Sequence, residues 1–331
     1  MHNFERKIAA EIIKGAQPVM ILSEADVERF VDPGRLLDGL QEGFKQVSRG
    51  DIQVPPRPEI TVPGRGFMLS MPAWTPGSPM MVKMVNVFEG NLDIDLPNHL
   101  ATIVLFDENT GKTLCVMDGT YITGVRTAAS AIVSVRTLAR PEAKVATLVG
   151  AGVQGREHLR LLPLVREFEK IHIASLVYED AERLAATSPV AEAVRDVESA
   201  VRRSDVICLA SHSYEPVIDA GWVAPGTHVS SVGYAPPRGE LPPELLPRGR
   251  LFVEDICAFE PTPVGCAELA GVEPSTGTIL GEALLESDFP RKDDKEITIY
   301  KAMGIAMEDL VAARIAYDSA VAANHSTVAI F

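Results

Sequence analysis

The fold of this chain is decided by one stretch, Val145-Ala-Thr-Leu-Val149-Gly150-Ala-Gly152-Val-Gln-Gly155. An apolar strand is expected over 145–149, and a helix follows from Arg156. Gly150 permits a tight turn, Gly152 lets the main chain approach a pyrophosphate, and Gly155 allows the helix to pack closely on the strand. The glycine spacing alone is a weak signal, but the strand before it and the helix after it are the context of a dinucleotide-binding loop.

The chain beyond this loop alternates between short apolar runs and helical stretches. The expected strands are 145–149, 171–175, 205–210, 228–233 and 251–254. Strands separated by helices are typical of a parallel, doubly wound α/β sheet. We therefore expect a Rossmann dinucleotide-binding domain over 125–295.

The part before residue 125 has a different pattern, rich in β-strand signals and punctuated by proline and glycine. The expected strands are 52–62, 66–74, 80–88, 99–106 and 113–117, the last two joined by a hairpin turn at 107–111. An alanine-rich helix over 122–138 leads into the second pattern. We expect the strand 296–300 and the helix 303–323 to pack back onto the first module, which gives an α+β, mostly antiparallel substrate-binding and dimerisation domain of 1–124 and 296–331.

Composition bounds the class of protein. At 331 residues the chain exceeds what one core supports, and its 46% hydrophobic and 23% charged residues are those of an ordinary globular protein. A formal net charge of −14 disfavours nucleic acid and anionic membranes as partners. The four cysteines and seven histidines form no metal-binding pattern, so no metal is expected. Without a membrane-length apolar run or an apolar signal core near Met1, a cytoplasmic location is expected.

Three cations stand out in this acidic chain: Arg57 among prolines, Lys83 in an apolar strand, and Arg126 among small helical residues. Each has an ordinary explanation, since Arg57 suits a surface loop, Lys83 an edge strand and Arg126 an exposed helix face. A lysine on the same strand face as Val85 and Val87 is nevertheless costly to bury without an anion, and arginine binds carboxylates in a bidentate manner. Together they indicate a pocket for a small carboxylate near a nicotinamide.

The sequence gives an ambiguous signal at the position expected to bind the adenosine ribose of the coenzyme. The acidic residue expected at the end of the second strand is replaced by Ser175, and no arginine stands beside it to hold a 2′-phosphate. NAD is favoured and NADP stays open. His212 follows the expected strand 205–210 at the coenzyme edge, where it can touch the nicotinamide ribose or be an ordinary loop histidine.

Several collinear motifs resemble the ornithine cyclodeaminase/mu-crystallin family from about residue 50 to 320. They include Lys83-Met-Val-Asn86, Arg126-Thr-Ala-Ala-Ser130, the glycine loop and Tyr300-Lys-Ala-Met-Gly304-Ile-Ala-Met-Glu-Asp309. The resemblance implies a Rossmann domain, a substrate module and a homodimer. It also implies an NAD(P)-dependent enzyme of amino-acid metabolism or, in crystallin-like members, a small-molecule binding protein.

The resemblance assigns roles to individual positions. Arg57, Lys83 and Arg126 correspond to the residues that hold the substrate carboxylate, Asn86 belongs to the same motif as Lys83, and Lys83 is the candidate proton donor or acceptor. The positions expected to contact the coenzyme, from the glycine loop and from this resemblance together, are Asn98, Arg126, Thr127, Gly150, Ala151, Gly152, Val153, Gln154, Gly155, Ser175, Ser211, His212, Val232 and Gly233.

Two departures from the family pattern distinguish between the activities that the family includes. Cyclodeaminases carry an Asp after the glycine corresponding to Gly233, where this chain has Tyr234, and Ser70 stands near the position of a second acid. Losing the first acid removes the expected base for ring closure. We therefore expect a reductase that converts an α-imino acid to an L-amino acid. An ornithine or lysine cyclodeaminase using bound NAD, and a non-catalytic binding protein, are the alternatives. The sequence leaves open whether the substrate is a cyclic ketimine, iminosuccinate, or pyruvate with an amine.

Overall fold

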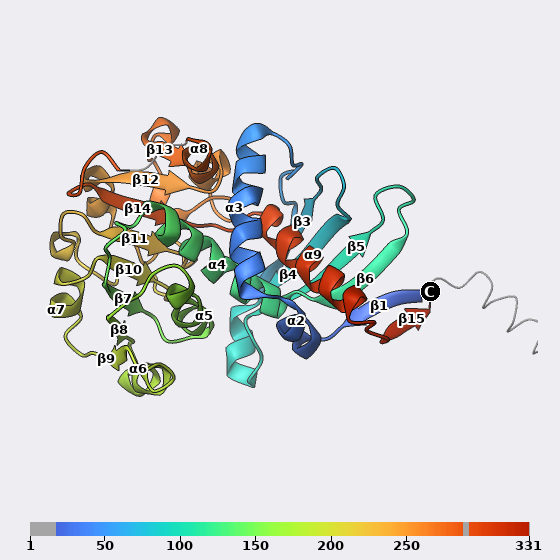
Figure 1. Ribbon diagram of the computed structural model, residues 1–331, viewed down its shortest axis with the longest axis horizontal. Helices are drawn as coiled ribbons and strands as arrows, with labels where there is room; N and C mark the ends of the chain where they lie inside the picture. The colour runs from blue at the N-terminus through green and yellow to red at the C-terminus, as the bar shows by residue number, and fades with distance from the viewer. Residues whose placement is uncertain (1–17, 287–290, 331) are drawn as a thin grey trace, which may run out of the picture.

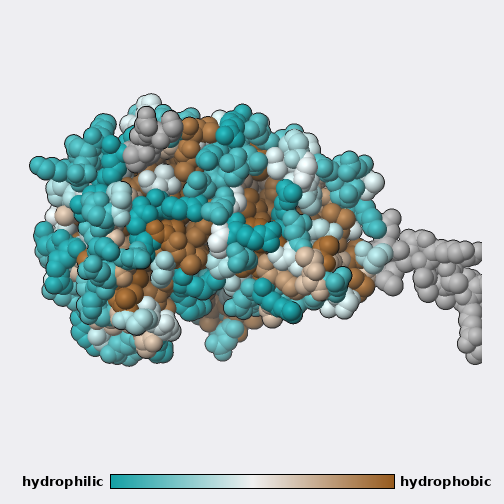
Figure 2. Space-filling model, in the orientation of Figure 1, coloured by the Kyte–Doolittle hydropathy of each residue, from teal (hydrophilic) through white to brown (hydrophobic). Residues whose placement is uncertain are grey.

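A computed structural model describes residues 18–286 and 291–330 of the chain, and it contains two β-sheets with helices between and around them (Figure 1). Residues 1–17, which include the segment where no signal core is expected, lie outside the described residues. No helix in the described ranges is long and apolar enough to cross a membrane. The face drawn in Figure 2 is mostly hydrophilic, with separate hydrophobic patches on both halves.

The first sheet has seven strands and is antiparallel except where β1 pairs with β6. Their spatial order is β15 (Val328–Ile330), β1 (Pro18–Leu22), β6 (Thr113–Asp118), β5 (His99–Phe106), β4 (Met80–Val87), β3 (Gly66–Ala73) and β2 (Glu59–Val62). The mostly antiparallel module is thus present. The strand expected over 52–62 begins only at Glu59, because the prolines at 55, 56 and 58 have no N–H to donate to a neighbouring strand.

Three helices pack on one face of this sheet: α2 (Glu24–Phe30), α4 (Thr120–Leu138) and α9 (Ala306–Ala322). A further helix, α3 (Pro33–Arg49), packs on α4 and α9. Helix α9 packs on β3 and β4, and α4 packs on β5. Alternation along β4 buries Met81, Lys83, Val85 and Val87 beneath the helices and turns the residues between them to the opposite face.

The second sheet has eight strands, and all of its pairings are parallel. Their order is β13 (Gly277–Ile279), β12 (Gly249–Val253), β14 (Ile297–Lys301), β11 (His228–Ser231), β10 (Val206–Leu209), β7 (Val145–Val149), β8 (Lys170–Ala174) and β9 (Ala191–Ala193). The helices of this half are α5 (Val153–Leu161), α6 (Tyr178–Ala185), α7 (Val197–Arg202) and α8 (Leu280–Leu285). This arrangement confirms the predicted α/β fold class.

One expectation about the chain's path is wrong. The strand expected over 296–300 does not return to the first module, because β14 lies inside the parallel sheet between β11 and β12. All five of its residues are buried, which requires cover on both faces of the sheet. Only α9 and β15 return, the latter pairing with β1. The division into 1–124 with 296–331 and 125–295 otherwise stays a prediction.

Candidate active site

The glycine loop between β7 and α5 is closely packed on one side and open on the other. Gly150 has a φ of 122°, and a Cβ there would lie 2.2 Å from the Ala210 carbonyl oxygen. A Cβ on Gly155 would lie 2.2 Å from the Gly150 oxygen, whereas one on Gly152 would meet nothing within 4 Å. Helix α5 begins at this open side, and no side chain caps it. Its unpaired N–H groups therefore fit a pyrophosphate.

The loop lies where the order of the parallel strands reverses. The chain passes from β7 to β8 on one side, and β10 and β11 follow on the other. Dinucleotides bind in the crevice at the carboxyl ends of strands at such a switch point. Ser175 follows β8, Ser211 follows β10, and Val232 and Gly233 follow β11, so the predicted coenzyme residues share one edge of the sheet.

Lys83 is buried in the first sheet against the first turn of α9. Its Nζ lies 2.8 Å from Oδ2 of Asp309 and 3.5 Å from the Thr123 hydroxyl, and its side chain is 1% exposed. Burial lowers the pKa of Lys83 to about 8, against the opposing effect of Asp309, and the charge of Arg126 lowers it as well. The ammonium can therefore lose its proton close to neutral pH.

Arg126 joins the same acids from α4. Its Nε donates to Oδ1 of Asp309 at 3.0 Å, and its Nη1 donates to Oε2 of Glu308. Burial disfavours its charge, but Asp309 and Glu308 outweigh that effect and raise its pKa. Asp309 thus bridges Lys83 and Arg126 and brings two of the three predicted cations together.

Arg57 approaches this cluster from the loop before β2. Its Nη1 donates to the Gly304 carbonyl at 3.1 Å, and Nη2 donates to the Val264 carbonyl at 2.5 Å. Arg126 lies against the same glycine, because a Cβ on Gly304 would be 2.2 Å from its Nη1. Burial lowers the pKa of Arg57, and the positive charge of Arg126 contributes to the lowering. The main chain at Gly304 therefore lies between the two guanidinium groups.

A second buried acid supports this main chain. Glu254 accepts hydrogen bonds from the main-chain N–H groups of Met303 at 3.1 Å and Gly304 at 2.7 Å, and from the Tyr300 hydroxyl at 2.9 Å. Burial and then the nearby Glu254 raise the pKa of Glu308 well above its usual range, although Arg126 lowers it. Glu254 thus anchors the main chain that leads into the first turn of α9, and its proximity disfavours ionisation of Glu308.

Residues from the two halves of the molecule meet across the crevice. Asn98 lies before β5, and its Nδ2 is 3.5 Å from Oε2 of Glu89. Nε2 of His212, in the loop after β10, is 3.5 Å from the same oxygen. The structure thus brings the predicted coenzyme residues Asn98 and His212 to one carboxylate, which the sequence did not single out.

The remaining predicted coenzyme residues lie at the start of α5 and on the facing part of α4. Gln154 donates from Nε2 to the Gly124 carbonyl at 3.1 Å, which ties the two helices together. Val153 is 55% exposed beside this contact, and Thr127 and Ala151 are half-buried. An exposed apolar residue and an open glycine at a helix start leave room for a ligand.

Asn86 does not belong to the cation cluster. It lies three positions after Lys83 on β4, and successive side chains of a strand point to opposite faces. Its cross-strand partners Met68 and Leu100 lie on the face that the helices do not cover. The structure therefore places Asn86 away from Lys83, and its predicted role in substrate binding stays a prediction. Ser70 lies on that same far face, so its departure from the family pattern says nothing about the cluster.

The sequence reading missed the acids that organise the cluster. Glu308 and Asp309 stand in the first turn of α9, where acidic residues ordinarily interact with the helix dipole. The signal in the sequence was the run that follows them, because two adjacent acids begin a helix that is otherwise rich in alanine and apolar residues; the structure buries both acids fully.

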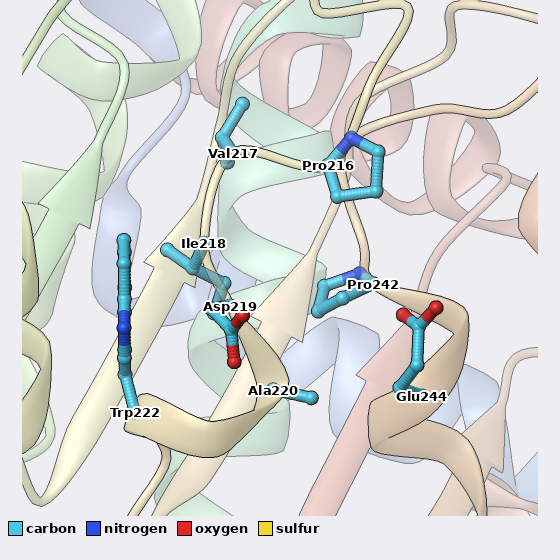
Figure 3. A pocket seen from close by; sticks show the side chains of 8 residues that line it. All are labelled: Pro216, Val217, Ile218, Asp219, Ala220, Trp222, Pro242 and Glu244. Atoms are coloured by element: carbon cyan, nitrogen blue, oxygen red, sulfur yellow. The ribbon is translucent and has the colours of Figure 1, made fainter.

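A surface hollow lies elsewhere on the parallel-sheet half, between η3 (Ala220–Trp222) and η4 (Pro243–Arg248) (Figure 3). Its charged lining residues, Asp219 and Glu244, are acids, which suit neither a carboxylate nor a phosphate. None of the predicted site residues lines it.

A dinucleotide-binding parallel sheet, joined to a second sheet that carries buried cations at the crevice, defines a class of two-domain oxidoreductase-like proteins. Within that class the chain belongs to the ornithine cyclodeaminase/mu-crystallin family, whose sequence profile matches residues 17–324. The match confirms the resemblance seen in the sequence motifs.

Three relatives illustrate this membership. Ketimine reductase mu-crystallin of Mus musculus is 33% identical over 291 residues, which are 86% of this chain and 90% of the relative. The structure of Thermococcus litoralis Delta(1)-pyrroline-2-carboxylate reductase in complex with NADH and L-proline is 30% identical, with a TM-score of 0.84 over 92% of this chain and 98% of that one. An archaeal alanine dehydrogenase dimer with bound NAD is 28% identical, with a TM-score of 0.86 over 95% of this chain and 99% of that one.

Proposed function

We propose that this chain is an NAD-dependent reductase that converts an α-imino acid to an L-amino acid. The observation that carries the proposal is the cluster formed by the half-buried Arg57 and the buried Lys83 and Arg126 beside the dinucleotide crevice. Its relatives include a ketimine reductase and a pyrroline-2-carboxylate reductase, whose names specify substrates with a C=N bond and, for the second, a carboxylate. When bound, NADH supplies the hydride for such a reduction.

The related structures and the geometry of the cluster favour an imino acid with one carboxylate. The pyrroline-2-carboxylate reductase, 30% identical to this chain, is named for a cyclic imine with a single carboxylate. The guanidinium groups of Arg57 and Arg126 both lie against Gly304, and guanidinium groups bind carboxylates in a bidentate manner. We therefore place imino acids with a single carboxylate ahead of iminosuccinate.

Arg57 and Arg126 would hold that carboxylate and orient the C=N carbon, an effect of positioning. Lys83 would donate its proton to the nitrogen as the amine forms, and a pKa of about 8 suits this role at neutral pH. Asp309 fixes the position of the Lys83 ammonium, because its carboxylate is itself held in place by Arg126. Lys83 is thus the proposed catalytic residue, and Asp309 a positioning residue.

The test is a substrate panel with the purified protein. Cyclic ketimines such as pyrroline- and piperideine-2-carboxylate, iminosuccinate, and pyruvate with ammonia are each supplied with NADH or NADPH. We expect NADH to be consumed fastest with a one-carboxylate imine. Ammonia release from ornithine or lysine with catalytic NAD would instead identify a cyclodeaminase, and tight NADH binding without turnover would identify a binding protein.

We further propose a homodimer built on the uncovered face of the first sheet, the face on which no helix of residues 18–286 and 291–330 packs. Apolar side chains cover this face in register across β2, β3, β4 and β5; they include Ile60, Met68, Met84, Leu100, Val82 and Val104. Ile60 is 61% exposed on the edge strand β2, where an open apolar edge favours association. A second copy of this chain presents the same face, and the related alanine dehydrogenase is a dimer.

The cytoplasmic location stays a prediction.

A further inference from the structure

We propose that Glu240 is a positioning residue for the coenzyme: its buried carboxylate holds together the two loops that form the nicotinamide side of the crevice. This inference rests on the proposed coenzyme site and assigns a role to a residue that neither the glycine loop nor the carboxylate cluster contains. Glu240 is 1% exposed, so its charge is withdrawn from water and needs internal partners.

Those partners come from the ends of two neighbouring strands. Oε2 of Glu240 accepts from the Ser211 N–H at 2.7 Å and the Ser211 hydroxyl at 2.6 Å, directly after β10. Oε1 accepts from the N–H groups of Val232 at 3.1 Å and Gly233 at 2.7 Å, and from the Ser231 hydroxyl at 2.9 Å. Five donors therefore converge on two carboxylate oxygens, and three of them are main-chain groups at the coenzyme edge.

These hydrogen bonds fix the orientation of the peptide groups that line the crevice. The N–H and C=O of a trans peptide point in opposite directions. With the Ser211 N–H directed at Glu240, the Ala210 carbonyl turns the other way and reaches the Gly150 turn, where it lies 2.2 Å from the site of a Cβ. With the Gly233 N–H held in the same manner, the Val232 carbonyl also faces away from Glu240 and is presented as an acceptor.

A buried ion pair, Lys301 with Glu268, holds the carbonyl side of Gly233. Nζ of Lys301 donates to the Gly233 carbonyl at 2.7 Å, to the Ser231 hydroxyl at 3.2 Å and to Oε1 of Glu268 at 2.8 Å. Both peptide groups of Gly233 are therefore fixed, one by Glu240 and one by Lys301. Because these peptide groups are already fixed in the free protein, coenzyme binding does not cost the free energy of ordering them.

The experiment compares Glu240→Gln with Glu254→Gln. Both replace a fully buried carboxylate that accepts main-chain N–H groups by an amide of the same shape, but Glu254 lies beneath the substrate cluster. The amide offers one acceptor oxygen and turns an NH₂ group toward donors. NADH affinity is measured by fluorescence titration, substrate KM at saturating NADH, and stability by thermal unfolding.

We expect Glu240→Gln to weaken NADH binding about ten-fold or more, the scale of lost hydrogen bonds to a charged group, and to leave substrate KM within about two-fold. Glu254→Gln should instead raise substrate KM about ten-fold or more and leave NADH affinity within about two-fold, with a similar loss of stability. If Glu240→Gln weakens NADH no more than Glu254→Gln does, Glu240 is merely structural and the inference is overturned.

A milder variant covers the case in which Glu240→Gln does not fold. Ser231→Ala removes one donor to Glu240 at a buried position, and it should weaken NADH binding about two- to five-fold, less than Glu240→Gln does because four of the five donors remain. Unchanged NADH affinity in this variant would overturn the inference. Failure of the wild-type protein to bind NADH at all would instead refute the proposed function on which the inference depends.

Discussion

Lys83 shows how a single residue connects the sequence pattern to the chemistry. Alternation along β4 predicted its place among the buried apolar residues, and the structure adds the partner that makes burial tolerable, Asp309 at 2.8 Å. Because burial lowers its pKa to about 8, the side chain can exchange a proton at slightly alkaline pH.

The pKa of Lys83 predicts opposite pH dependences for the two directions of the reaction. Imine reduction needs the ammonium, so kcat/KM should fall as pH rises through about 8, whereas amine oxidation needs the neutral amine and should rise over the same range. Lys83→Arg keeps its charge at all these pH values and should lose the alkaline limb of the reduction profile.

The companion variant Lys83→Ala should lower kcat/KM for imine reduction about 10²- to 10⁴-fold, the usual contribution of a general acid. Steady-state rates across the pH range measure both effects. Full kcat/KM in Lys83→Ala would assign the proton to water and remove the proposed role.

At the scale of elements, the turn between β14 and α9 joins the two halves and shapes the substrate site. Gly304 has a φ of 75°, and its main chain contacts Arg57 and Arg126 and donates to Glu254. A side chain there would displace the Arg126 guanidinium, because the added Cβ would lie 2.2 Å from its Nη1.

Gly304→Ala should therefore raise substrate KM about ten-fold or more, by the cost of misplacing a charged hydrogen-bonding group, with little change in NADH affinity. Gly271→Ala is the matched control, because its φ of 77° imposes the same backbone strain while its Cβ would meet nothing within 4 Å. Steady-state kinetics of both variants separate the contact from the strain. An equal rise in KM in the two variants would contradict the account.

Sequence patterns predicted those elements whose periodicity reflects one local environment. The strands 99–106 and 145–149 coincide with β5 and β7, since each shows a clear alternating or wholly apolar run. The position of β14 was not predictable in this way, because a short buried apolar strand fits the interior of either sheet. Asn86 was assigned from its motif, and only the pleat of β4 shows that it points away from Lys83. Glu240 and Glu254 act through tertiary hydrogen bonds, which leave no periodic signal.

At the scale of the whole molecule, the uncovered face of the first sheet predicts association. Met84→Lys places a charge in the middle of that face and should convert a dimer to a monomer, because an interface cannot bury an unpaired charge at low cost. Val321→Lys, at a 49% exposed position near the end of α9, is the control and should stay dimeric. Analytical ultracentrifugation decides, and a wild-type monomer, or a dimeric Met84→Lys, would refute this interface.

The protein, on this proposal, transfers a hydride from NADH to the carbon of a C=N bond next to a carboxylate. The most direct measurement supplies NADH that carries two deuterium atoms at C4 of the nicotinamide, with a one-carboxylate cyclic ketimine, and examines the amino-acid product by mass spectrometry and NMR. We predict one deuterium at Cα and an equal amount of NADH consumed. An unlabelled product, or ammonia released from ornithine without net consumption of NADH, would contradict the claim.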